Sequence, residues 1–115
     1  MNILLVFLGG GIGSVLRYVL NNLISARTEN FPYSILVINI IGSFAIGLCA
    51  GFIKTEQLAL FLMVGILGGF TTFSAFSLDV VTMFNDGKAP AALIYVICSV
   101  VFSILAAFLG LIIAR

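Results

Sequence analysis

The stretch GGFTTFSAFS, residues 68–77, lies in the middle of a long apolar segment of the chain. Its two adjacent glycines each weaken a helix by about 1 kcal/mol relative to alanine, and its two threonines are natural caps for a helix that begins again after them. We therefore predict a membrane helix that is broken at mid-membrane. Irregular backbone survives at that depth only where protein packs against it or where it lines an ion or water path, so this break is the predicted functional centre.

The composition of the whole chain is that of an integral membrane protein. Of its 115 residues, 63% are hydrophobic and 8% are charged, and the mean hydropathy is +1.34. Soluble domains carry about 25% charged residues. The net charge of +1, with scattered basic residues, argues against nucleic acid as a partner. The sequence contains no histidine and no paired carboxylates in one plausible site, which indicates a protein that is not an enzyme.

Four apolar segments are each long enough to cross a hydrocarbon core of about 30 Å as a helix. We expect residues 1–115 to form a single all-α membrane domain with both termini on the same side. Cys49 and Cys98 lie inside apolar segments, where we expect free thiols. The predicted spans are Asn2–Ile24, Tyr33–Ile53, Leu58–Phe84 and Pro90–Ala114.

The charges at the span ends do not fix an orientation in the membrane. Lys54 and Arg115 lie near the side of the termini and Arg27 and Lys88 near the other, so the basic residues of the loops balance, two against two. A chain without bias can insert both ways, and two oppositely oriented copies can then build one site. Because four short helices enclose little space, we expect a pathway between subunits rather than within one.

Several polar residues within the spans are candidates for a functional site. Arginine near the bilayer centre costs about 2.5–3.5 kcal/mol, so we expect Arg17 to face a water-filled vestibule or a partner, unless it snorkels to the interface. Asn39 needs hydrogen-bond partners or water, and both a pore and an interhelical bond would supply them. In the fourth span, the spacing of Tyr95, Ser99 and Ser103 places three hydroxyls on one helix face.

Two further patterns indicate helix packing. Ser43, Gly47 and Gly51 recur every four residues, which lets another helix approach closely. Asp79 is the one acid within any predicted span. Because the first and third spans run in parallel, we predict a structural pair between Asp79 and Arg17.

These motifs together resemble the Fluc family of fluoride channels, also called CrcB. The resemblance covers the whole chain and rests on GGxxGxxxRY at residues 9–18, on Asn39 followed by GSF at residues 42–44, and on GGFTTFSAFS, which is highly specific. The chain departs from the family pattern at Ala75, where a threonine is usual. In some members of the family, two different chains form a heterodimer.

The resemblance implies a multi-pass protein of the cell membrane that forms a dual-topology antiparallel homodimer with two fluoride pores. It also implies a structural sodium ion that is not transported, held by the backbone carbonyls of Gly68 and Thr71. Arg17 matches the vestibule arginine. The positive edge of an aromatic ring can hold an anion weakly enough for it to leave, as conduction requires. The pore residues that the resemblance implies are Asn39, Phe73, Phe76, Tyr95, Ser99 and Ser103.

Two other functions remain open from the sequence. The first is a small dual-topology secondary transporter for fluoride or another small ion. A proton-coupled transporter needs a carboxylate within the membrane, and the first two spans contain none. The second is a non-conducting heterodimer subunit, in which the same polar residues only join helices.

Overall fold

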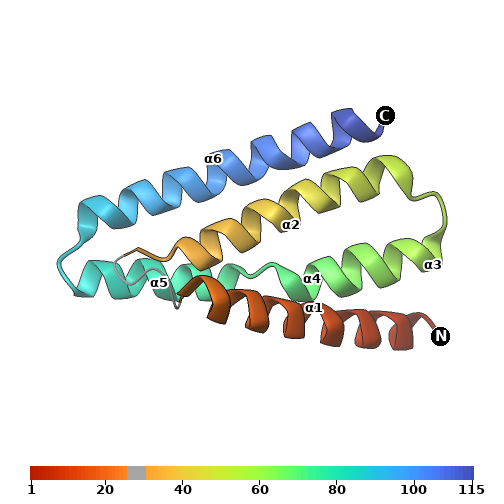
Figure 1. Cartoon of the computed structure of the whole chain (residues 1–115), viewed down its shortest axis with the longest axis horizontal. Helices are drawn as coiled ribbons and strands as arrows, with labels where there is room; N and C mark the ends of the chain where they lie inside the picture. Colours follow the sequence, from red (N-terminus) through yellow and green to blue (C-terminus); the bar gives the residue numbers. More distant parts are fainter. Residues whose placement is uncertain (26–30) are drawn as a thin grey trace.

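The computed structural model describes residues 1–25 and 31–115, and every regular element within them is a helix (Figure 1). The predicted all-α fold is confirmed, and the described part contains four helical segments long and apolar enough to cross a membrane. Their ends differ from the predicted ends by one or two residues at most. Arg27 lies outside the described residues. The observed segments are Asn2–Ser25, Tyr33–Phe52, Glu56–Asn85 and Ala89–Ala114.

The third segment consists of several helical pieces. The first, second and fourth segments are the single helices α1, α2 and α6. The third begins with α3 and continues as the π-helix η1, whose wider hydrogen-bonded turns include a bond from the Gly68 N–H toward the Met63 carbonyl. Turns of this kind are rare and often occur at functional sites. The pieces are α3 (Glu56–Ala59), η1 (Leu60–Leu67), α4 (Gly68–Phe70) and α5 (Phe73–Asn85).

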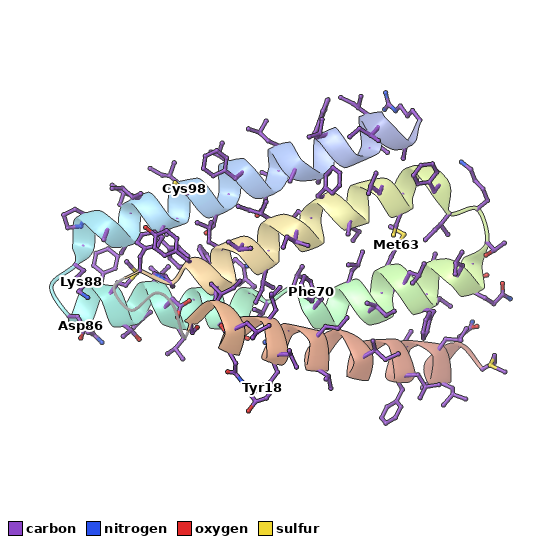
Figure 2. The ribbon with its side chains drawn as sticks, in the orientation of Figure 1. Tyr18, Met63, Phe70, Asp86, Lys88 and Cys98 are labelled. Carbon is purple, nitrogen blue, oxygen red and sulfur yellow. The ribbon has the colours of Figure 1, made fainter. Side chains whose placement is uncertain are left out.

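The bundle measures 47 × 29 × 22 Å, and the long helices run roughly along its long axis. The longest dimension, 47 Å, is close to the thickness of a bilayer with its headgroups, about 40–45 Å. Helix α2 lies alongside α6, and α1 lies alongside η1 and α4 (Figure 1). The N- and C-termini lie at the same end, as four spans require. Asp86 and Lys88 mark the turn at the opposite end (Figure 2).

Glycines allow the helices to approach each other closely. A methyl group at Gly47 would overlap the Ala107 carbonyl oxygen of α6, and one at Gly51 would overlap the Ala114 side chain. The predicted packing role of these two glycines is confirmed. On α1, a methyl group at Gly13 would overlap the Ile66 carbonyl oxygen of η1. In lipid, such close van der Waals contact is a main source of association between helices.

The buried core is small and lies where α2, α4, α5 and α6 meet. Phe70, Met83 and Tyr95 are its large members, with Ile35 and Ile38 from α2. Most other large apolar side chains are exposed, as expected of helices whose outer faces contact lipid. Tyr18, for example, points away from the bundle (Figure 2).

We expect Gly13→Ala to lower the stability of the folded protein by about 1–3 kcal/mol, because the added methyl group forces α1 and η1 apart. The matched control is Gly11→Ala on the same helix, where nothing lies within 4 Å of the added methyl group. That control should gain up to about 1 kcal/mol from helix propensity. Thermal unfolding in detergent micelles measures both variants, and equal midpoints would contradict the close contact at Gly13.

Candidate functional site

Helix α4 ends at Phe70 and α5 begins at Phe73, and the two threonines between them have extended backbone. Thr71 has φ −84° and ψ 156°, and Thr72 has φ −150° and ψ 123°. The Thr72 hydroxyl oxygen accepts the Ala75 N–H at 3.1 Å, which makes Thr72 the N-cap of α5. Gly68 is still helical, with φ −62° and ψ −36°. The irregular backbone therefore lies at the threonines and not at the glycines.

Asn39 of α2 binds the irregular backbone on both of its hydrogen-bonding sides. Its Oδ1 accepts the Thr72 N–H at 3.0 Å, and its Nδ2 donates to the Thr72 carbonyl at 3.1 Å. In a continuous helix, the Thr72 N–H would donate to the carbonyl of Gly68, four residues earlier. Asn39 thus replaces one helical hydrogen bond and leaves the Gly68 carbonyl without its helical donor. The interhelical bond predicted as one reading of Asn39 is confirmed.

Arg17 of α1 binds the next carbonyl along. Its Nε donates to the Gly69 carbonyl at 3.1 Å, an acceptor that a continuous helix would pair with the Phe73 N–H. Asp79 instead accepts the Tyr95 hydroxyl at 2.9 Å. The predicted pair between Arg17 and Asp79 is therefore wrong, because each has a different partner.

A cavity of about 360 Å³ lies beside this backbone, between α2, η1, α5 and α6. It brings together seven of the residues singled out in the sequence, whereas Arg17 and Tyr95 lie outside its lining. Met63 points from η1 toward α2 (Figure 2). Ser43 also lines the cavity, although its spacing had suggested packing; its place one turn after Asn39 was the signal that could have revealed it. The seven residues are Asn39, Gly68, Thr71, Phe73, Phe76, Ser99 and Ser103.

The cavity offers hydrogen-bond donors and aromatic rings, and its lining includes no charged side chain. The Ser99 hydroxyl is buried and has no hydrogen-bond partner among the described residues. Asn39 uses one of its two amide hydrogens on Thr72, so the second is available. The rings of Phe73 and Phe76 lie 5.5 Å apart at 50°. Neutral donors and ring edges suit a small anion that is bound weakly.

Tyr95 of α6 is fully buried and lies between two aromatic rings. Its ring centroid is 5.1 Å from that of Phe76 and 5.5 Å from that of Phe31. Its hydroxyl donates to Asp79, and its ring contacts Phe76, which lines the cavity. Of the three aligned hydroxyls of α6, the cavity therefore receives Ser99 and Ser103.

Residues 4–111 match the family described as CrcB-like protein, Camphor Resistance (CrcB). The chain is 45% identical to a protein of Agrobacterium fabrum named fluoride-specific ion channel FluC, over 100% of this chain and 97% of that protein. It is 43% identical to fluoride-specific ion channel FluC 2 of Nitrobacter hamburgensis, over 100% and 98% of the two chains. For a FluC protein of Paracoccus denitrificans, the identity is 46% over 96% and 91%.

We expect Asn39→Ala to destabilise the start of α5, because the Thr72 N–H and carbonyl would lose their partners at a cost of about 1–3 kcal/mol for each group left unsatisfied. Hydrogen exchange of the first amides of α5 should become faster. The matched control is Ser43→Ala, one turn along α2, which changes the same cavity without touching Thr72. If both variants exchanged at the wild-type rate, Asn39 would not hold this backbone.

Proposed function

Because the chain belongs to the CrcB family, we propose that it is a fluoride-selective channel that lets fluoride leave the cell passively across the cell membrane. The observation that carries the proposal is identity of 43–45% along the full chain to proteins named fluoride-specific ion channels, and not to enzymes. The cavity supports it independently, because its donors are neutral and it is lined by aromatic rings, whose edges carry partial positive charge.

The proposed pathway runs through the cavity, which one chain lines, whereas the sequence had predicted a pathway between subunits. Ser99 and Ser103 form its polar side, and Phe73 and Phe76 form its aromatic side. A dehydrated fluoride ion needs hydrogen-bond donors, and the unpartnered Ser99 hydroxyl and the second amide hydrogen of Asn39 provide them. No fixed positive charge lines the cavity to trap the ion, so it can bind and leave quickly.

Arg17 and Tyr95 are proposed to act at the margins of this pathway. Arg17 uses its Nε on the Gly69 carbonyl, and the remaining guanidinium N–H groups stay available to attract an anion in a vestibule. Tyr95 borders the pathway through its ring contact with Phe76.

The proposed assembly is an antiparallel homodimer, or a heterodimer with a paralogous chain. Phe73 is 78% exposed in the single chain, and Gly68 and Ser74 are also exposed. These three residues flank the irregular backbone, whose polar groups lipid does not tolerate at membrane depth. A second copy would cover them. The even balance of basic residues between the two ends allows that copy to insert in the opposite orientation.

The backbone at the threonines also fits the structural sodium ion that the family resemblance implies. The Gly68 carbonyl lacks its helical donor, and the extended Thr71 carbonyl lies outside both helices. Both residues line the cavity. Among residues 1–25 and 31–115, no group of three or more acidic, thiol or imidazole side chains could hold a metal ion, so backbone oxygens are the proposed ligands. A bound sodium ion would supply positive charge near the anion path.

In reconstituted liposomes, we expect fast fluoride efflux without a pH gradient and no detectable chloride efflux. Phe73→Ile and Phe76→Ile should each slow fluoride efflux by about tenfold or more, equivalent to 1.4 kcal/mol, because isoleucine keeps bulk but removes the ring edge. Phe7→Ile is the matched control, since Phe7 is 74% exposed on α1 and lies outside this cavity.

The possible outcomes separate the candidate functions. Fluoride movement that requires a pH gradient would indicate a secondary transporter. No movement of either anion would indicate a non-conducting subunit that needs a different partner chain. Equal fluoride efflux from all three phenylalanine variants would remove the cavity rings from the pathway.

Sodium should stabilise the assembled dimer by about 2.7 kcal/mol at a hundred times its dissociation constant. Exhaustive replacement of sodium by N-methylglucamine should therefore lower dimer stability and fluoride efflux. Thr71→Val should keep this sodium dependence, because the Thr71 hydroxyl already donates to the Leu67 carbonyl and the proposed ligand is a backbone oxygen. If dimer stability and fluoride efflux were the same in sodium and in N-methylglucamine, the metal site would be ruled out.

A further inference from the structure

We infer that Asp79 is a positioning residue that fixes the Phe76 ring beside the cavity by acting through Tyr95. The inference rests on the proposed function in that it assigns a role in fluoride passage. Its structural part, the attachment of α5 to α6, can be tested without any flux measurement.

The contacts form a continuous chain from the carboxylate to the cavity. Asp79 accepts the Tyr95 hydroxyl at 2.9 Å, and the Tyr95 ring lies 5.1 Å from the Phe76 ring at 49°. Phe76 lines the cavity and lies 5.5 Å from Phe73. Phe31 also packs against Tyr95 in a T-shaped arrangement, with ring centroids 5.5 Å apart. Tyr95 is therefore held by two ring contacts and by the hydrogen bond of its hydroxyl.

Two attachments of helix α5 involve hydrogen bonds to neighbouring helices, and this bond is one of them. The helix is 13 residues long and is held at its start by Asn39 through Thr72. In the described part of the chain, the bond from Tyr95 to Asp79 is the only hydrogen bond that joins α5 to α6. The ring contact between Phe76 and Tyr95 also joins these two helices, but apolar packing constrains rotation of a helix less sharply than a directed bond.

The spacing of residues along α5 links the bond between Tyr95 and Asp79 to the orientation of the Phe73 and Phe76 rings. Phe73, Phe76 and Asp79 recur every three residues, so they lie near one face of the helix. A rotation of α5 about its axis would therefore move Asp79 and both rings together. By holding Asp79, the buried Tyr95 hydroxyl holds the direction in which the rings face.

The role requires a hydrogen-bond acceptor rather than a negative charge. A buried tyrosine hydroxyl needs a partner, and the Asp79 Oδ2 atom is the one it has. Arg17, the basic residue expected beside Asp79, bonds to Gly69 instead. Asparagine at position 79 would keep an acceptor oxygen in place and remove the charge, so it separates the two explanations.

The test compares Asp79→Asn, Asp79→Ala, Tyr95→Phe and the double variant of Asp79→Ala with Tyr95→Phe. Thr82→Ala is the matched control, because Thr82 lies one turn further along α5 and makes no bond to α6. Each variant is measured as the full dimer for fluoride and chloride efflux from liposomes and for hydrogen exchange of the α5 amides.

We expect Asp79→Ala and Tyr95→Phe each to slow fluoride efflux by about tenfold and to speed exchange across α5, because the directed bond is lost. The double variant should be no slower than either single one, since both remove the same bond. Asp79→Asn and Thr82→Ala should stay within about twofold of wild type in both measurements.

If Asp79→Asn slowed fluoride efflux as much as Asp79→Ala, the inference would be overturned, and the result would indicate a role for the negative charge. Wild-type efflux and wild-type α5 exchange in Asp79→Ala would overturn it outright. Absence of fluoride efflux from the wild-type protein would refute the proposed function, and the exchange data would then still decide whether Asp79 holds α5.

Discussion

Main-chain N–H and carbonyl groups inside a membrane have no water to bond to, and this constraint governs the arrangement around Thr71 and Thr72. Three side chains satisfy it. Asn39 pairs with both main-chain groups of Thr72, Arg17 donates to the Gly69 carbonyl, and the Thr72 hydroxyl caps α5. Asn39 and Arg17 would be costly in apolar helices, but hydrogen bonds to main-chain groups satisfy them. The same bonds satisfy main-chain groups that the interrupted helix leaves without helical partners.

The bond of the Thr72 N–H to Asn39, in place of the Gly68 carbonyl, also affects the cavity. Because Asn39 takes the Thr72 N–H, the Gly68 carbonyl lacks its helical donor, and Gly68 lines the same cavity as Ser99, whose hydroxyl has no partner among the described residues. An oxygen acceptor and hydroxyl and amide donors thus lie in one cavity, although its lining carries no charged side chain. In the proposed channel, main-chain oxygens would hold the cation and neutral donors would pass the anion, so that different atoms would bind each kind of ion.

The parts of the structure that sequence could predict are those set by local pattern. Apolar segments of about 20 residues predicted the four spans, and the small residues Gly47 and Gly51 predicted close packing. Contacts between distant residues were not predictable, because they depend on how each helix is rotated. The sequence predicted a pair between Asp79 and Arg17, but Asp79 accepts a hydrogen bond from Tyr95. It predicted a helix-packing role for Ser43, but Ser43 lines the cavity. The π-helical η1 has no signature in its run of apolar residues.

The position of the two chain ends limits how such a protein can be joined to a copy of itself. Both termini lie at the same end of the bundle (Figure 1). A direct tandem fusion of two copies, without a crossing linker, would therefore hold them in the same orientation across the membrane. A fused gene that encodes an inverted pair would need a linker that itself crosses the membrane an odd number of times. Duplication of the gene as separate copies, each free to settle on one orientation, has no such requirement.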